Sequence, residues 1–282
     1  MKILTFEVEE WFHILDNPST KTEKEWVNFP SRIHEGMERI FDILDYHDYN
    51  ATFFVLGWIA EKYPEIVRMI VQRGYEIGSH TNSHQLVYEQ SKQDFYQDVD
   101  RSIKTLEDVS GTKVRMFRAP GFSITKQNLW AFEVLVNLGI EIDSSVFPAG
   151  RNHGGMPNYG IAEPSIIKYN GIHLKEFPIN THKLIGKNIA YSGGGYFRLI
   201  PYSLLKKWTS KDTYVMSYMH PRDFDFNQPM IQDLNLSRKF KSYYGLKTAN
   251  KKFKKWLTDF HFVDIATADN LVNWNLAKQV KL

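Results

Sequence analysis

The chain has 282 residues, of which 43% are hydrophobic, enough to build a sizeable core. Lys and Arg number 35 against 32 Asp and Glu, so no large basic excess favours nucleic acid as a partner. Because the sequence has no cysteine, any metal site must use histidine and carboxylate ligands. No secretory signal pattern and no run of 18 apolar residues is visible, so we expect a cytoplasmic protein.

Strands and helices are expected to alternate through the first half of the chain. The predicted strands are residues 2–8, 51–56, 75–79, 114–118 and 140–143. The predicted helices are residues 31–47, with Ser31 as its cap, 58–72, 93–109 and 126–138. Such alternation is typical of parallel β/α units, so the predicted fold class is α/β.

The alternation breaks in the second half. Residues 15–30 and 147–174 are rich in turn-forming residues, which favours a surface loop for the first and a loop or small hairpins for the second. Further strands are expected at residues 175–179, 214–219 and 262–266, and helices at 201–211 and within 236–259. We expect one domain over residues 1–282, with a basic and aromatic helical extension at about 236–260.

The pair His80 and His84 is the most informative motif. On a single helical turn, a separation of four residues brings both imidazoles to one side, where they can bind one cation. Two histidines alone are weak evidence for a metal site, and a carboxylate usually completes the set of ligands. Glu7 and Glu9, on one face of the first predicted strand, are the candidates.

Polar residues also follow other predicted strands. Arg118, Asp143 and His220 each lie at the carboxyl end of a strand, as do His80 and the two acids. In a β/α barrel those ends share one rim, where catalytic residues belong. Each residue also has a plainer interpretation: Arg118 could bridge strand ends, Asp143 could cap a helix, and His220 could be a turn residue. Their coincidence favours an enzyme.

Taken in order, these motifs resemble the polysaccharide deacetylase (NodB-homology) family of carbohydrate esterases over residues 1 to about 225. The matching stretches are Glu7-Val8-Glu9, His80-Thr81-Asn82-Ser83-His84, Arg118-Ala119-Pro120, Asp143-Ser144-Ser145 and Tyr218-Met219-His220. Residues 192–198 and the pair His220-Pro221 resemble a subgroup associated with bacterial capsule, exopolysaccharide or O-antigen synthesis.

The resemblance implies a distorted, incomplete (β/α) barrel with its active site at the carboxyl-terminal rim of the strands. It also implies the roles of the residues. A divalent metal, expected to be Zn²⁺, is held by Glu9, His80 and His84. Glu7 is the base, Arg118 orients it, the Gly121 N–H faces the oxyanion, and His220 protonates the leaving group with Asp143 as its partner. The family's base is normally Asp, and Phe122 is displaced by Gly121 from the usual aromatic position.

The implied function is metal-dependent removal of an N-acetyl group from an acetamido sugar during bacterial surface-polysaccharide synthesis. The sugar could be nucleotide-linked, lipid-linked or part of an oligosaccharide. One alternative is hydrolysis of an O-acetyl or other N-acyl group. Another, motivated by Glu7 in place of Asp, is a degenerate barrel that binds a saccharide without turnover.

Several other residues have two interpretations. Tyr196 or Trp58 could stack on a sugar ring, although aromatic residues are usually core, and His13 is expected to be structural. The Gly-rich residues 193–195 lack the Lys-[Ser/Thr] of a phosphate loop and are expected to form a flexible loop near the sugar. Residues 251–257 mix lysine with aromatics, which indicates a solvated helix face or peripheral contact with the inner membrane surface.

Overall fold

A sheet of parallel strands organises the chain. The computed structural model describes residues 1–15, 17–151, 154–184 and 186–282. Six strands run parallel, in the spatial order β2 (Thr5–Val8), β3 (Thr52–Val55), β4 (Glu76–Ser79), β5 (Met116–Phe117), β6 (Ile142–Asp143) and β8 (Ile172–Glu176). Beyond them, β7 (Ser165–Tyr169) is antiparallel to β8, and β12 (Lys278–Lys281) is parallel to β7.

The other end of the sheet continues less regularly. β1 (Lys2–Ile3) pairs in parallel with β11 (Val215–Met216), and a bridge between Phe6 and Met219 extends this contact to β2. A separate hairpin contains β9 (His182–Leu184) and β10 (Lys187–Ile189). Within the described residues the strands form no closed barrel, so the expected distorted, incomplete β/α architecture is confirmed.

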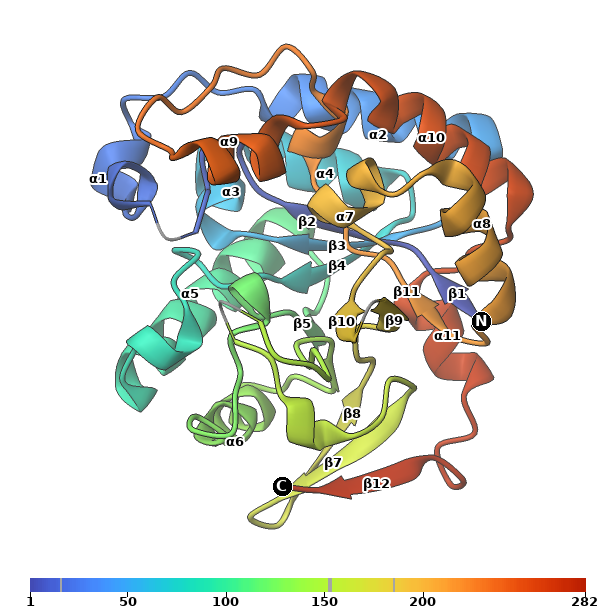
Figure 1. Cartoon of the computed structure of the whole chain (residues 1–282). Helices are drawn as coiled ribbons and strands as arrows, with labels where there is room; N and C mark the ends of the chain where they lie inside the picture. Colours follow the sequence, from blue (N-terminus) through green and yellow to red (C-terminus); the bar gives the residue numbers. More distant parts are fainter. Residues whose placement is uncertain (16, 152–153, 185) are drawn as a thin grey trace.

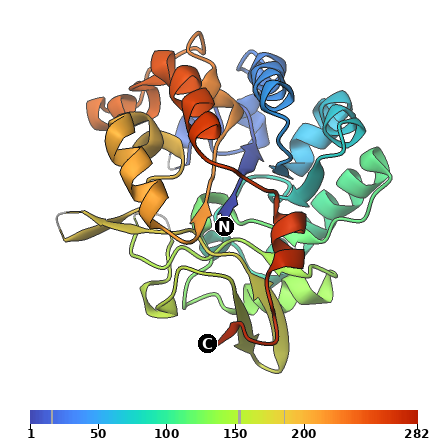
Figure 2. The ribbon, with the colours of Figure 1, turned by 90° about the vertical axis from the view of Figure 1, so that its right-hand side faces the viewer.

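Helices cover the outside of the strands, as Figures 1 and 2 show. They are α1 (Glu23–Trp26), α2 (Ile33–His47), α3 (Gly57–Lys62), α4 (Pro64–Gln72), α5 (Lys92–Ser110), α6 (Trp130–Asn137), α7 (Gly194–Leu199), α8 (Tyr202–Lys211), α9 (Leu236–Tyr243), α10 (Leu246–Asp259) and α11 (Ile265–Leu271). Short 3₁₀ turns are η1 (Pro18–Thr20), η2 (Val87–Glu89), η3 (Pro120–Phe122), η4 (Pro157–Tyr159) and η5 (Pro221–Phe224). None of the described helices is both long and apolar enough to cross a bilayer.

Two helix predictions for the first half need correction. The helix expected over residues 58–72 is two helices, because Pro64 lacks an N–H donor and begins α4. Ser31 does not cap α2; its hydroxyl donates to Glu10. The Glu10 carboxylate in turn accepts from the backbone N–H groups of Arg32 and Ile33, so an acid distant in sequence serves as the cap.

The remaining errors lie in loops and in the second half. Residues 15–30, expected to be a surface loop, contain α1 and the buried Trp26, whose indole N–H donates to Thr20; residue 16 lies outside the described residues. The strand expected at 262–266 is wrong, since Asp264 caps α11 there and only Val263 bridges to Ile3. Residues 147–174, of which 152 and 153 are not described, hold β7 and the start of β8, so the hairpin interpretation is confirmed.

The helices expected within residues 236–259 are present as α9 and α10. Phe253, Trp256 and Leu257 of α10 are buried, at 0–1% exposure, in a core cluster that extends from Leu4 to Phe262. These apolar side chains face inward, so contact of this stretch with a membrane surface would depend on its lysines alone. The single-domain expectation stays a prediction.

Candidate active site

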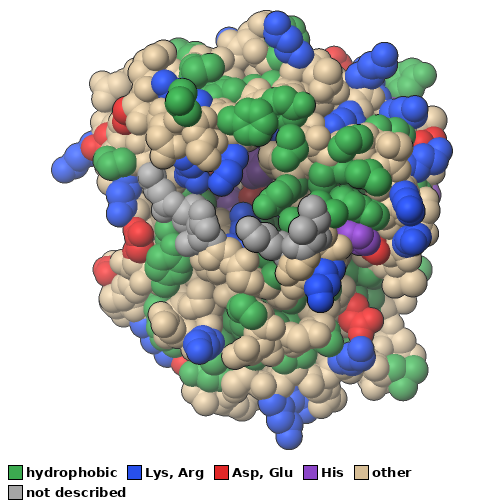
Figure 3. Space-filling view, viewed as in Figure 1, with side chains coloured by type: hydrophobic (Ala, Val, Ile, Leu, Met, Phe, Trp, Pro, Cys, Tyr) green, Lys and Arg blue, Asp and Glu red, His purple; other side chains and the backbone are tan. Residues whose placement is uncertain are grey.

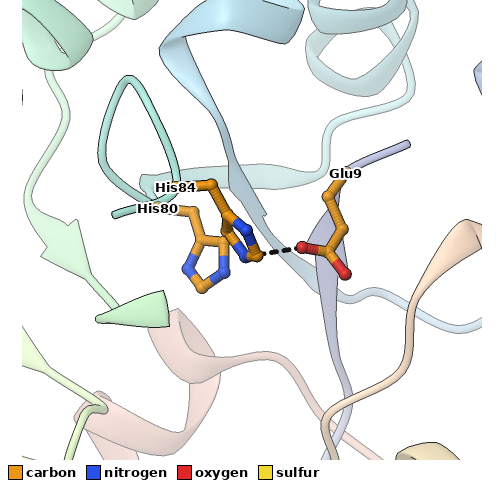
Figure 4. Close-up of side chains that lie close together, drawn as sticks. All are labelled: Glu9, His80 and His84. Carbon is orange, nitrogen blue, oxygen red and sulfur yellow. Dashed lines mark ion pairs between the residues drawn. The ribbon is translucent and has the colours of Figure 1, made fainter. Parts of the chain in front are cut away.

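Glu9 and two histidines form the centre of the site. Glu9 follows the end of β2, and its Oε2 lies 2.6 Å from Nε2 of His84. One ligand atom from each of Glu9, His80 and His84 lies within 4.8 Å of the other two, and all three side chains are buried. Figure 4 shows the His84 imidazole facing the Glu9 carboxylate, with the His80 imidazole beside it. The expected convergence of these three residues is therefore confirmed.

The two histidines do not lie on a helical turn, and this part of the prediction is wrong. They lie on a loop after β4, in which Thr81 has φ 69° and His84 has φ 54°. These left-handed positions fold the loop back on itself and replace helical spacing as the reason why the imidazoles meet. Asp98 of α5 holds the loop by accepting from the backbone N–H groups of Asn82 and Ser83, at 2.9 and 3.0 Å.

His80 has the arrangement of a metal ligand. Its Nδ1 lies 2.7 Å from the backbone oxygen of Arg118, which fixes Nδ1 as the donor and leaves Nε2 with its lone pair. That Nε2 is buried and has no hydrogen-bond partner among the described residues. Burial lowers the pKa of His80 to about 4, so the imidazole is neutral at physiological pH. A buried nitrogen acceptor without a partner is costly unless something binds it.

Glu7 lies beside this cluster and has two partners. Its Oε1 accepts from Nη1 of Arg118 at 3.3 Å, and its Oε2 lies 3.1 Å from Nε2 of His220. The Arg118 side chain is fully buried and is held by Ser144 and by Thr5, whose hydroxyl accepts at 2.7 Å. His220 reaches Glu7 because Met219 bridges to Phe6, in the neighbouring strand.

Glu7 and His220 have pKa values shifted in opposite directions. Burial alone would raise the pKa of Glu7, but contacts with His220, His80 and Arg118 lower it overall, so Glu7 is a carboxylate. Burial alone would lower the pKa of His220, but Asp223 and Glu7 raise it well above its usual value, so the imidazole is protonated. Such a pair has the charge states of a general base and a general acid.

The partner of His220 is Asp223, so the assignment of Asp143 to this role is wrong. Asp223 Oδ2 lies 3.0 Å from Nδ1 of His220 and accepts from its backbone N–H at the same distance. Asp223 follows His220 by three residues in η5, within easy reach of the imidazole. Asp143 instead accepts from both the hydroxyl and the backbone N–H of Ser145.

Asp143 belongs to a second buried acid pair, behind Arg118. It lies opposite Glu176 in the parallel pairing of β6 and β8. Burial and the neighbouring Asp143 raise the pKa of Glu176 well above its usual value, which favours its neutral form. Both side chains are fully buried, and Glu176 also accepts from the backbone N–H of Val146, at 3.1 Å.

The residues predicted to contact substrate have mixed outcomes. Gly121 lies in η3 with φ 59°, and the role of its N–H stays a prediction. Tyr196 on α7 is 47% exposed, but Trp58 is buried among Phe12, His13 and Trp26 and cannot stack on a sugar. His13 packs on Trp26 and lies outside the three-residue cluster, in agreement with a structural role.

The Gly-rich segment is a packed element and not a flexible loop, which corrects the prediction. Gly193 bridges to Tyr218, and a Cβ at residue 193 would lie 2.0 Å from the Tyr218 backbone oxygen. Gly194 and Gly195 begin α7. Gly193 therefore allows the start of α7 to approach the segment that leads to His220.

Sequence reasoning missed the supporting residues. Asp98 and Asp223 lie outside the recognised motifs, Arg198 was seen only as part of residues 192–198, and Ser144 was seen only as a neighbour of Asp143. A charged residue three positions after His220, in a turn with proline, was the one local signal for Asp223.

The site opens to the surface. His220 is 16% exposed at its side chain, more than Glu7 or Glu9 at 6%. In Figure 3, histidine and acidic side chains are visible at the bottom of a hollow near the middle of the face. A cavity of about 230 Å³ adjoins His84 and is lined by Ile14, Trp26, Leu86 and the Lys21–Glu89 ion pair, among others.

Parts of the sequence are similar to known proteins. Residues 19–141 match the family described as polysaccharide deacetylase, and residues 144–270 match a domain of unknown function, DUF3473. A peptidoglycan-N-acetylglucosamine deacetylase of Bacillus cereus is 31% identical over 127 residues, 45% of this chain and 46% of that protein. A chitooligosaccharide deacetylase of Azorhizobium caulinodans is 35% identical over 82 residues, 29% of this chain and 39% of that protein. The matches thus span less than half the length of these relatives.

Solved structures share the fold over nearly the whole chain. A putative polysaccharide deacetylase from Mycobacterium smegmatis has a TM-score of 0.65 at 17% identity, covering 99% of this chain and 92% of that one. A family 4 carbohydrate esterase pseudoenzyme from Bacillus anthracis has a TM-score of 0.51 at 13% identity, covering 100% and 69%. At such low sequence identity, the similarity to these structures shows a shared fold and nothing about function. The sequence matches to deacetylases are confined to less than half of this chain, where residues 19–141 are similar to the polysaccharide deacetylase family.

Proposed function

We propose that this protein is a metal-dependent hydrolase that removes the N-acetyl group from an acetamido sugar. The observation that carries the proposal is one compact site in which a His-His-Glu cluster lies beside a carboxylate and a protonated histidine. Amide hydrolysis needs an activated water, stabilisation of an oxyanion and an acid for the amine. This site has groups for each requirement.

The donor set fits a divalent cation. His80 Nε2 is a buried acceptor with no partner in the described part of the chain, His84 and Glu9 lie near it, and the sequence has no cysteine. Two nitrogens and one carboxylate oxygen suit zinc, and also leave open coordination positions. When bound, the cation would supply Lewis acidity, which acidifies water and polarises a carbonyl group. We propose Zn²⁺ as that cation.

The protein's own residues would move the protons. Glu7, ionised and held through Oε1 by Arg118, takes a proton from the attacking water with Oε2. His220, protonated and held at Nδ1 by Asp223, donates from Nε2 to the departing amine. We propose that the Gly121 N–H stabilises the oxyanion and that Tyr196 contacts the sugar.

The substrate we propose is an acetamido sugar of bacterial surface polysaccharide, on a nucleotide, a lipid or an oligosaccharide. The resemblance of residues 192–198 to the capsule and exopolysaccharide subgroup supports it, and the cavity beside His84 offers space for part of a saccharide. The relatives with printed activities are named for peptidoglycan or chitooligosaccharides. A cytoplasmic location, with contact at the inner membrane face through Lys251, Lys254 and Lys255, belongs to the same proposal.

Two alternative functions would use the same site residues. O-deacetylation would need the same base and metal and less help from His220, because an alcohol leaves more readily than an amine. A binding protein without turnover is favoured by Glu7 in the place of Asp. Against it, the longer Glu7 side chain has contacts to both Arg118 and His220.

One assay separates these functions. Free acetate is measured with N-acetylated sugars, nucleotide sugars, lipid-linked sugars, chitooligosaccharides and peptidoglycan fragments, and with O-acetylated counterparts, before and after chelation. The proposal expects chelator-sensitive acetate release from an N-acetylated substrate. Release only from O-acetylated substrates would reassign the bond, and no release from any substrate by the metal-loaded protein would favour binding alone.

A further inference from the structure

Arg198 is a buried charge that the proposed reaction does not yet use. It lies on α7, 5% exposed, and its Nε is 3.1 Å from Oδ1 of Asp223, outside hydrogen-bond geometry, so the contact is an ion pair. Its Nη1 and Nη2 donate to the backbone oxygens of Lys241, Ser242 and Tyr244 at 2.9–3.2 Å. The guanidinium is thus fixed on both sides.

Asp223 divides its two oxygens between two partners. Oδ1 faces Arg198, whereas Oδ2 faces Nδ1 of His220. Both charged side chains of the ion pair are 4% exposed, so water cannot replace either partner. Burial alone would raise the pKa of Asp223, but Arg198 and His220 lower it overall, which keeps Asp223 ionised.

We infer that Arg198 is a positioning residue for the leaving-group acid: it fixes Asp223 so that His220 presents Nε2 to the departing amine. The orientation matters because only a His220 whose Nδ1 faces Asp223 can direct the Nε2 proton to the substrate. This inference rests on the proposed deacetylase activity. In the transfer, the C–N bond of the tetrahedral adduct breaks as the proton passes from Nε2 to nitrogen.

A purely structural role would have a different signature. Arg198 also holds α7 against the end of α9, so a variant could lower activity by loosening that packing. Lys252 offers a matched control because its Nζ donates to the backbone oxygens of Phe197, Arg198 and Ile200, at 2.7–3.1 Å. Lys252 therefore anchors the same helix but is not a partner of Asp223.

The experiment compares Arg198→Met and Lys252→Met on two substrates. One is the N-acetyl sugar and the other is 4-nitrophenyl acetate, whose leaving group needs no proton. We expect Arg198→Met to lower kcat for the amide roughly 10-fold or more, with KM and the ester rate within about two-fold of wild type. Lys252→Met should leave the amide-to-ester ratio unchanged. Equal losses on both substrates, or an equal change of the ratio in Lys252→Met, would overturn the inference.

Two further variants keep the test decisive if Arg198→Met folds poorly. Asp223→Asn should lower the same ratio, and Arg198→Lys should restore part of what Arg198→Met loses, because it keeps the charge. In the double variant, Arg198→Met should add little to Asp223→Asn, since both act through one contact. An unchanged ratio in Asp223→Asn, or full additivity, would contradict the inference. A wild-type protein that hydrolyses neither substrate would instead reject the proposed function itself.

Discussion

Residues 1–143 and residues 144–282 build the site in different ways. The first half is a regular series of β/α units, and its strand ends carry Glu7, Glu9, His80 and Arg118. The second half is irregular, yet it contributes His220 through the pairing of β11 with β1. The His-His-Glu cluster and the proposed base thus come from the half with repeated topology, whereas the proposed acid comes from the half without it. Glu7 and His220, the two groups that would move protons, lie side by side because the backbone of residues 5–7 is hydrogen-bonded to that of residues 217–219.

The largest effect should come from the cluster of the first half. The double variant His80→Ala and His84→Ala removes both nitrogen ligands, so we expect loss of the bound metal and of acetate release to the background rate. His34→Ala, a histidine whose side chain is 43% exposed and paired with Glu65, should keep both. Metal analysis of the purified proteins provides the measurement, and full occupancy in the double variant would contradict the assignment.

A large but smaller effect is expected at the base. Glu7→Asp shortens the side chain that now reaches both Arg118 and His220. A displacement of about 1 Å can cost on the order of 10²-fold in rate, so acetate release should fall by about that factor while metal content persists. Steady-state kinetics on one substrate provides the measurement. A gain in activity would instead identify the natural protein as degenerate.

Two aspartate-to-asparagine variants test which acid of the protein supports His220. Asp223→Asn should lower amide turnover roughly 10-fold to 100-fold, part of the contribution of general acid catalysis. Asp143→Asn should stay within a few-fold of wild type, because Asp143 pairs with Ser145 and Glu176 and not with His220. Comparable losses in the two variants, measured as kcat at unchanged metal content, would restore Asp143 to the mechanism.

The smallest effect concerns the junction of the halves. Asp225, 2% exposed at its side chain, pairs with Arg32 and Arg39 near α2. Burial alone would raise its pKa, but the two arginines lower it overall. The stabilisation is therefore complete above the ordinary aspartate pKa, near pH 4, and is lost as the pH falls through the lowered value. Asp225→Asn should cost about 2 kcal/mol at pH 7, with normal activity, and this difference should shrink in acid.

Denaturant unfolding at several pH values measures this difference in stability. The control is Glu35→Gln, because Glu35 also pairs with Arg32, at 3.4 Å, but is 43% exposed. A surface pair of this kind should contribute less than about 1 kcal/mol. A pH-independent loss in Asp225→Asn would show that the ion pairs are not its cause.

The sequence was sufficient to predict those site residues whose positions are determined by the ends of parallel strands. Glu7, Glu9, His80, Arg118 and His220 were recognisable because parallel strands bring their carboxyl ends to one edge. The conformation that joins His80 to His84 was not predictable, because left-handed φ at Thr81 and His84 is uncommon for these residue types. The partner Asp223 was missed because a distant acid, Asp143, matched the family motif, whereas a buried contact decides the pairing.

The fold class was predicted correctly, but some individual elements were not, for similar reasons. Alternation of apolar segments located the parallel strands β2 to β6. It left the antiparallel β7 within a region expected to be a loop or small hairpins, and it gave a strand where α11 begins. Short apolar segments such as residues 262–266 suit a strand or a helix equally well, and an Asp cap decided the outcome. Arg198 lies within residues 192–198, which resemble a family subgroup, but its role was not predictable because it depends on a contact with Asp223, 25 positions later in the chain.

The most direct test of the central claim compares the two proton-transfer residues on two leaving groups. Glu7→Gln and His220→Ala are each assayed, fully metal-loaded, with the N-acetyl sugar and with 4-nitrophenyl acetate. The account predicts that Glu7→Gln loses activity on both substrates, because both need an activated water. His220→Ala should lose roughly 10²–10⁴ on the amide and little on the ester. Equal losses of His220→Ala on both substrates, or an active Glu7→Gln, would contradict the division of base and acid between the two halves.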